Sequence, residues 1–235
     1  MIYVISDLHG YPQQDLRKLL AGAGFSDEDF LYILGDVIDR HGDGGVETLL
    51  WLLEQPNAQL ILGNHEAMLL SCRFALEEVT DEALAELTVE HLGTLDNYMF
   101  NGGDVTLRAL RKLPLERVRD IFSYLTEAPL YEGVSVGDTD YLLVHAGLQG
   151  FRPDKKLSAY APDELMWQGP AMDEDYFEDI VTVFGHTPTF VYGEAFRGRV
   201  LTKRTWIDID AGAGYGEEPV LFRLDDRREF RLSEL

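Results

Sequence analysis

The feature that most constrains the fold is a junction that recurs along the chain, in which an apolar run gives way to Asp, Asn or His near a glycine. The clearest case is the segment 31–40, where four apolar residues precede Gly35, Asp36, Asp39 and Arg40. An apolar run that ends at a glycine and a charged cluster is typical of a buried strand leading into a loop. Comparable junctions follow the apolar runs at 2–5, 60–62, 141–144 and 180–184.

The segments between these runs indicate an α/β fold. Helical spacing of leucines predicts helices over 15–22 and 44–54 and another that begins at 66, so residues 1–70 alternate strand and helix. Near the end of the chain, consecutive short apolar runs predict an antiparallel portion and therefore mixed sheets. These later strands are expected at 190–192, 200–201, 206–209, 220–224 and 229–232.

Residues 71–128 differ in character from both flanks. Leu84, Leu87, His91 and Leu95 recur at helical spacing, so we expect a helical insertion at 71–128 within one domain that covers residues 1–235. The insertion also holds a basic cluster, for which a solvated helix face and a rim that recruits an anionic substrate are the two interpretations. The cluster consists of Arg108, Arg111, Lys112, Arg117 and Arg119.

Composition narrows the class of partner. The net charge of −22 disfavours nucleic acid and anionic lipid, because binding to either depends on Lys and Arg. No apolar run approaches the roughly 20 residues of a membrane helix, and the first residues lack the basic region of a signal peptide. Cys72 is the single cysteine, which excludes an intramolecular disulfide. We therefore expect a cytoplasmic protein with no membrane and no nucleic-acid partner, whose oligomeric state the sequence leaves open.

The polar residues at the junctions form a set of oxygen and nitrogen ligands without thiolate. Such ligands suit manganese, which we expect, with iron or zinc as alternatives. Asp7 and His9 are two apart, so in an extended segment they would point the same way and reach one ion. A second ion would be held by other junction residues, and Asp36 could bridge the two. The ligands expected for the pair are Asp7, His9, Asp36, Asn64, His145 and His186.

Two divalent ions about 3.5–4 Å apart hold a bridging water and lower its pKa, and the resulting hydroxide can attack a phosphorus atom in line. The guanidinium of Arg40 can bind two phosphate oxygens. His65 is the candidate acid for the leaving group, and Asp39 can hold its other ring nitrogen. Each motif alone is also explained as a turn, a helix cap or a structural histidine, the class to which we assign His41 and His91. Five together favour a dinuclear metal site.

These motifs resemble the calcineurin-like metallophosphoesterase superfamily, and within it the phosphoprotein phosphatase branch. Asp7-Leu8-His9-Gly10, 35–40, Gly63-Asn64-His65-Glu66, His145-Ala146-Gly147 and 185–188 match that branch in order and approximate spacing. The segments 101–107 and 208–216 are similar to those of bacterial and phage serine/threonine phosphatases and symmetrical diadenosine tetraphosphatases.

The resemblance implies an α/β/β/α sandwich of two mixed β-sheets with the dinuclear site at one edge. It implies the same ligand and acid roles and adds Tyr215 as an active-site tyrosine. The sequence departs from the family pattern at His41, where a glycine is usual, and at Gln168, because the family places an arginine just after the residue matching Trp167. Arg152 is the candidate replacement, and a lost charge-assisted contact would cost roughly 1.5–3 kcal/mol.

The expected function is a metal-dependent phosphatase that hydrolyses phosphate monoesters, first of all a serine/threonine protein phosphatase. Hydrolysis of dinucleoside polyphosphates is the alternative within the same chemistry, and a catalytically impaired metal-binding regulatory module is the alternative of another class. We expect a phosphorylated protein or a small phosphoester as the partner. The substrate is expected to contact Arg40, Asn64, Arg152 and Tyr215.

Overall fold

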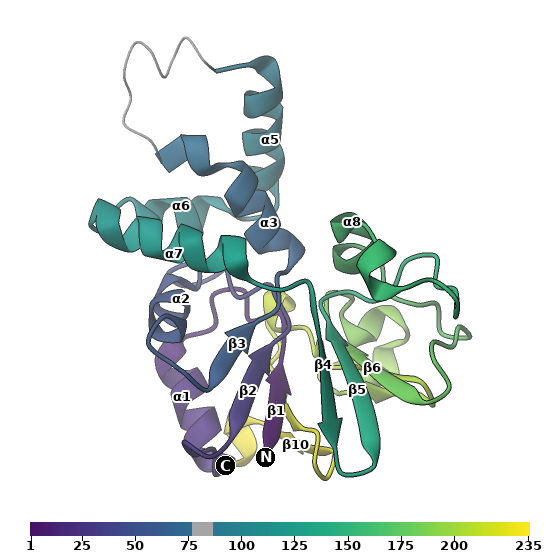
Figure 1. The fold of residues 1–235 in the computed structure, drawn as a ribbon. Helices are drawn as coiled ribbons and strands as arrows, with labels where there is room; N and C mark the ends of the chain where they lie inside the picture. Colours follow the sequence, from purple (N-terminus) through teal and green to yellow (C-terminus); the bar gives the residue numbers. More distant parts are fainter. Residues whose placement is uncertain (77–86) are drawn as a thin grey trace.

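A computed structural model describes residues 1–76 and 87–235 of the chain. Leu84, one of the residues on which the helical expectation depended, lies outside these ranges. The described residues form two five-stranded sheets with helices around them (Figure 1). Among the described helices, none has the length and apolar character needed to cross a bilayer.

The first sheet has the strand order β10-β9-β1-β2-β3. Its three N-terminal strands are parallel, because helices connect them, whereas β9 pairs antiparallel with β1 and β10 pairs antiparallel with β9. The bounds are β1 (Ile2–Ile5), β2 (Phe30–Ile33), β3 (Ala58–Leu60), β9 (Leu221–Arg223) and β10 (Arg228–Phe230).

The second sheet has the order β4-β5-β6-β8-β7. Strands β5, β6 and β8 are parallel, and the outer strands β4 and β7 are antiparallel to their neighbours. The expected pair of mixed sheets is therefore confirmed. The bounds are β4 (Tyr131–Val136), β5 (Thr139–Val144), β6 (Ile180–Phe184), β7 (Leu201–Thr202) and β8 (Trp206–Asp208).

The two sheets face each other across an apolar core. Val4 and Leu34 from the first sheet share a buried cluster with Leu143, Val183 and Ile207 from the second. Because parallel strands are buried on both faces, each sheet also needs cover on its outer side. Helices and loops supply this cover through two further apolar clusters, one on each sheet.

The first sheet is covered by α1 and α2, and Figure 1 shows α3, α5, α6 and α7 gathered beyond the end of β3. Helix α7 illustrates why they pack, since Val118, Ile121, Phe122 and Leu125 recur at helical spacing and are all buried. The helices are α1 (Gln13–Gly22), α2 (Val46–Leu52), α3 (Asn64–Ser71), α5 (Val89–Phe100), α6 (Asp104–Leu110), α7 (Leu115–Glu127) and α8 (Pro162–Met166).

Two details differ from the sequence-based expectation. The strand predicted at 190–192 is wrong, because Thr189–Val191 forms a 3₁₀ turn in which the Val191 amide donates to the Pro188 carbonyl over 2.8 Å. The fixed φ of Pro188 starts this turn. Strand β4 was not anticipated, although a turn at Gly137, with a φ of 58°, leads directly from it into β5.

The basic cluster of the helical segment is engaged within the protein. Arg108 forms an ion pair with Asp104 at 2.6 Å, and Arg117 pairs with Glu54 at 3.4 Å. Arg111 donates to the Ala75 carbonyl over 3.1 Å. These partners favour the interpretation of the cluster as a solvated helix face.

Candidate active site

The strand-end junctions converge at one edge of the sandwich. Parallel strands end at the same edge of their sheet, and in open α/β sheets that edge is where ligands bind. The segments that leave β1, β2, β3, β5 and β6 bring their polar side chains together there. These side chains are buried, apart from the half-buried His186, although they are spread over 180 positions from residue 7 to residue 186.

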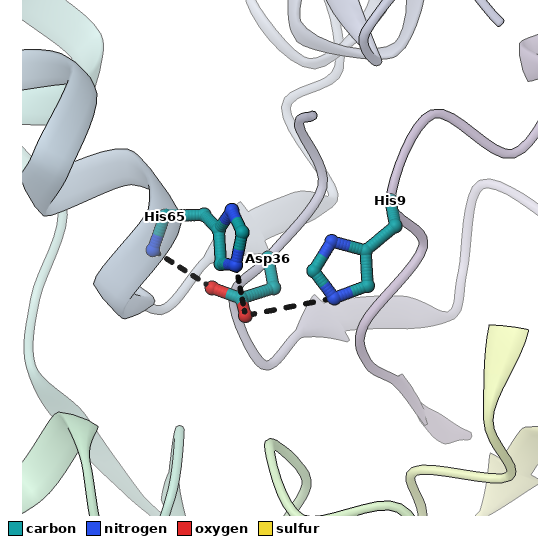
Figure 2. A group of neighbouring side chains, drawn as sticks. All are labelled: His9, Asp36 and His65. Atoms are coloured by element: carbon teal, nitrogen blue, oxygen red, sulfur yellow. Dashed lines mark hydrogen bonds and ion pairs between the residues drawn. The ribbon is translucent and has the colours of Figure 1, made fainter. Parts of the chain in front are cut away.

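One group of ligands forms around His9. Its Nε2 atom lies 3.8 Å from Asp36 Oδ2 and 4.0 Å from Asp7 Oδ1. Figure 2 shows the His9 and His65 rings on either side of the Asp36 carboxylate. The His9 Nδ1 atom donates to the Ile38 carbonyl over 3.2 Å, which leaves the lone pair on Nε2 free to bind a cation.

A second group forms around His145. Its Nε2 atom lies 2.9 Å from Asn64 Oδ1, 3.2 Å from His186 Nδ1 and 3.4 Å from Asp36 Oδ1. The His145 Nδ1 atom donates to the Leu34 carbonyl over 2.7 Å, so Nε2 presents a lone pair in the neutral ring. Neighbouring ligands of an ion bound at about 2.1 Å lie about 3 Å apart. Acceptor atoms at this spacing fit a cation between them.

Asp36 joins the two groups, with one carboxylate oxygen toward each. Together the groups therefore match two cation sites that share one carboxylate. Carboxylate, imidazole and amide donors without thiolate suit a divalent transition metal and leave its identity open. Two groups of three residues have the spacing of metal ligands, namely His9, Asp36 and His65, and Asp36, His145 and His186.

The protonation states of these residues also suit metal binding. Burial disfavours the charged rings and lowers the pKa of His9 to about 3 and that of His186 to about 4, so both are neutral at pH 7. Burial alone would raise the pKa of Asp36, but the surrounding histidines, led by His145, hold it well below its usual value. The site thus offers neutral imidazoles and an ionised central carboxylate.

The pKa of His65 shifts in the opposite direction. Burial opposes its charged form, but the charge of Asp36 and the hydrogen bond to Asp39 outweigh burial and raise the pKa of His65 to about 9. Its Nδ1 atom lies 2.7 Å from Asp39 Oδ2, and its Nε2 atom is 3.9 Å from Asp36 Oδ2. One histidine is therefore protonated at pH 7 beside others that are not, as expected when acid and ligand roles are divided.

The backbone around the site is strained. Of the seven non-glycine residues with positive φ in the described ranges, all but Arg227 belong to the site. Such conformations cost of order 1–3 kcal/mol each and cluster at functional sites. Asp7 and His9, with φ of 52° and 43°, are thus not in the extended conformation that the sequence suggested. Their side chains still converge, because left-handed residues turn the loop back across the edge of the sheet.

The junction glycines are explained by contacts with ligands from neighbouring strands. A Cβ atom at Gly35 would lie 2.5 Å from His145 Nδ1. A Cβ atom at Gly63 would clash with Asp36, and one at Gly185 would clash with Asp7. The absent side chain is what lets ligands from separate strands approach one another.

Glu66 organises the central loop, a role that the sequence analysis did not assign. Its buried carboxylate accepts hydrogen bonds from the backbone amides of Asp36 and Val37, each over 2.8 Å, and of Gly63 over 3.1 Å. These bonds fix the loop that carries Asp36 against the start of α3. In the sequence, the signal for this role was the position of Glu66 directly after Asn64 and His65.

Two further residues that the sequence analysis missed hold Asp39 from the helical segment. The Tyr98 hydroxyl donates to Asp39 Oδ1 over 2.7 Å, and Thr106 Oγ1 donates to the same oxygen over 2.6 Å. Tyr98 and Thr106 are fully buried, and the Asp39 amide donates back to Thr106 Oγ1 over 3.0 Å. The helices α5 and α6 therefore fix the carboxylate that pairs with His65.

Arg40 lies at the open side of the site. One of its terminal nitrogens is 3.4 Å from His65 Nε2, and its guanidinium stacks on the exposed ring of Tyr215 at 5.1 Å. A Cβ atom at Gly214 would clash with the His9 ring and with Arg40, so this glycine allows Tyr215 to approach. The structure therefore places Tyr215 beside Arg40.

Among the described contacts, none joins Arg152 to the ligand groups. It is exposed on the loop that follows β5, where its charge assists Lys155, the main cause, in lowering the pKa of Glu164. Trp167 is 44% exposed and its ring lies 6.1 Å from that of His186. Among the contacts of residues 1–76 and 87–235, Arg40 is the arginine that reaches the ligand groups.

Comparison with known proteins defines the class. Residues 1–211 match the family model described as calcineurin-like phosphoesterase, which is most of the chain, so this protein belongs to that family. The resemblance found in the sequence is confirmed. With the ligand groups described above, the protein is a metallophosphoesterase.

Curated relatives that match are named symmetrical bis(5'-nucleosyl)-tetraphosphatase. The protein from Actinobacillus succinogenes is 38% identical over 79 residues, which is 33% of this chain and 28% of the relative. The protein from Acidovorax sp. (strain JS42) is 25% identical over 161 residues, which is 68% of this chain and 48% of the relative. The matches thus span under half the length of these relatives.

Solved structures show the same fold. The crystal structure of a protein proposed to be a diadenosine tetraphosphatase aligns with a TM-score of 0.63 at 17% identity, covering 98% of this chain and 91% of that one. A protein serine/threonine phosphatase from Saccharomyces cerevisiae aligns with a TM-score of 0.53 at 17% identity, covering 97% and 75%. At this identity the likeness concerns the fold alone.

Proposed function

We propose that this protein is a dinuclear-metal phosphoesterase that hydrolyses dinucleoside polyphosphates. The observation that carries the phosphoesterase chemistry is the pair of acceptor groups on either side of Asp36, with a protonated His65 beside them. The curated relatives support the substrate class, since those compared above carry the name of a nucleosyl tetraphosphatase. These relatives favour hydrolysis of dinucleoside polyphosphates over the serine/threonine protein phosphatase activity that we first expected.

We propose that Asp7, His9 and Asp36 hold one divalent cation and that Asp36, Asn64, His145 and His186 hold the other. When bound, the cations supply positive charge and an activated water for phosphoryl transfer. Arg40 reaches the same space and can donate to phosphate oxygens. His65 carries a proton on Nε2 that it can give to the leaving oxygen.

An impaired regulatory module is the less favoured alternative. Asp39 and His65 form a close buried pair, and Tyr98 and Thr106 fix the orientation of Asp39. A module that only binds metal has no use for a protonated, precisely held histidine. The lack of an arginine after Trp167 would instead weaken the binding of phosphate.

A hydrolysis screen that detects each substrate's products tests the proposal. Purified protein with manganese would be supplied with diadenosine tetraphosphate, a phosphoserine peptide and para-nitrophenyl phosphate, and the nucleotide products would be separated by chromatography. We expect the highest kcat/KM on diadenosine tetraphosphate, with ADP as the product. A preference of tenfold or more for the phosphopeptide would reject the substrate class, and inactivity on all of them would reject the enzyme.

The raised pKa of His65 predicts a pH effect that is measured without metal. A histidine whose pKa rises from 6.5 to about 9 on folding stabilises the protein fully below pH 6.5, and this stability is lost as the pH rises through 9. The difference corresponds to roughly 3 kcal/mol. We expect Asp39→Asn to lower the His65 pKa by more than one unit in an NMR titration of metal-free protein. An unchanged midpoint would contradict the pairing.

The hydroxyl of Tyr98 is expected to act through Asp39. Tyr98→Phe removes one of two side-chain donors to Asp39 Oδ1, so the His65 ring is held less firmly and kcat should fall about threefold to tenfold with KM unchanged. Tyr124→Phe is the matched control. The Tyr124 hydroxyl lies on another helix, α7, and accepts from the Leu60 amide over 3.2 Å. Equal effects of the two changes on kcat would rule out a role specific to Tyr98.

A further inference from the structure

A groove of about 500 Å³ leads away from the proposed metal centre. One wall is a stripe of α3 in which the residues recur at the spacing of one helix face, from Asn64 through Ala67 and Met68 to Ser71. Asn64 is also a member of the second ligand group. The groove therefore begins at the reaction site and follows α3 for about 10 Å.

A stripe of α5 beside α3 also lines the groove. Glu90, Gly93, Thr94 and Asn97 recur along it at the same helical spacing, and the Asn97 side-chain amide donates to Met68 Sδ over 3.5 Å. Gly93 lies in the interior of this helix, where a glycine costs about 1 kcal/mol relative to alanine. A Cβ atom built on Gly93 meets nothing within 4 Å, so no close contact requires glycine at this position. The glycine instead keeps the middle of the groove open.

The chemistry of the groove excludes phosphate. Its charged lining residues in the described ranges are Glu90 and Asp163, both acidic, whereas phosphate requires positive groups. Trp167 borders the groove with a half-exposed ring, next to the His186 ring. An aromatic face stacks a nucleobase for roughly 1–3 kcal/mol. Carboxylates and amides accept hydrogen bonds from ring amino groups and ribose hydroxyls.

We propose that this groove binds one nucleoside of the substrate, with the base against Trp167 and the sugar or amino donors toward Glu90 and Asp163. The proposal rests on the proposed function and specifies how a dinucleotide is told apart from other phosphoesters. The polyphosphate would remain at the proposed metal centre and Arg40, because the acidic groove repels it. A small aryl phosphate reaches only the centre and does not enter the groove.

Gly93→Leu tests the proposal by filling the groove. Leucine is a better helix former than glycine and its Cβ atom meets nothing within 4 Å, so the variant is expected to fold, which a thermal melt would verify. We expect kcat/KM on diadenosine tetraphosphate to fall at least tenfold, mainly through KM, and that on para-nitrophenyl phosphate to change less than twofold. Gly93→Ala is the control for helix propensity and should leave both within about threefold.

Three results would overturn the proposal. They are an equal loss on both substrates, no loss on either, or a selective loss on a basic phosphopeptide, which would make the groove a peptide site. Adenosine, which carries no phosphate, gives a test that is independent of turnover. Saturation-transfer NMR should show adenosine bound to the wild type and not to Gly93→Leu, and the same signal in both would contradict the proposal even if the enzyme were inactive.

Discussion

His65→Asn is expected to reduce turnover of a phosphoserine peptide by about 10²–10⁴-fold while both metals stay bound, because the variant lacks the proton donor for the leaving alkoxide. Asn64, His145 and Asp36 should keep their positions, since the hydrogen bond of the His65 side chain goes to Asp39 and its contact with Asp36 is a longer one of 3.9 Å. Metal content by mass spectrometry and steady-state kinetics measure the two parts of the prediction.

The leaving group distinguishes an acid from a merely structural residue. Nitrophenolate leaves without a proton, and so does the phosphate oxygen of ADP, so the same variant should lose much less activity on para-nitrophenyl phosphate and on diadenosine tetraphosphate. His91→Asn is the matched control, because that ring caps the start of α5 at Thr88. A uniform loss across leaving groups would argue that His65 supports the structure rather than the proton transfer.

Asp36→Asn is expected to abolish activity by at least about 10³-fold through loss of metal. The variant keeps the shape of the side chain but removes the charge that lies 3.8 Å from His9 Nε2 and 3.4 Å from His145 Nε2, where the two proposed cations would share it. Fewer than one metal per chain should remain after dialysis. Chelator should then no longer lower the melting temperature, since ligands stabilise only the state that binds them.

Asp43→Asn is the control for this change. Its carboxylate lies in the same loop and accepts from the amides of Gly45 over 3.0 Å and Glu47 over 2.7 Å, outside the ligand groups. An asparagine keeps one of these two acceptors and leaves the ligand groups untouched, so metal content and activity should match those of the wild type. Retention of two metals by Asp36→Asn would contradict the shared-carboxylate arrangement.

The sequence anticipated the edge of the sheet well because its signals are local. A strand such as 31–34 and the glycine and aspartate after it are consecutive residues, and parallel strands must end at the same edge. The conformation of Asp7 and His9 was missed for the opposite reason. Left-handed φ at an aspartate and a histidine is imposed by the packing around the loop and has no signature in the residues themselves.

Arg152 and Tyr215 illustrate the limit for single residues. Both were assigned to the substrate from loops, yet the structure places Tyr215 against Arg40 and leaves Arg152 on an exposed loop beside Glu164. Loop paths depend on contacts with distant segments, so spacing along the chain does not predict which loop arginine approaches the phosphate.

The sequence by itself determined the α/β class, the chemistry of the ligand set and the candidate acid pair, because hydrophobic period and residue type are properties of short segments. Only the tertiary structure decided that Tyr98 and Thr106 hold Asp39 across as many as 67 positions, and that α3 and α5 line one open groove at Gly93. These contacts join segments that meet only when the chain is packed, and packing depends on the complete set of neighbours.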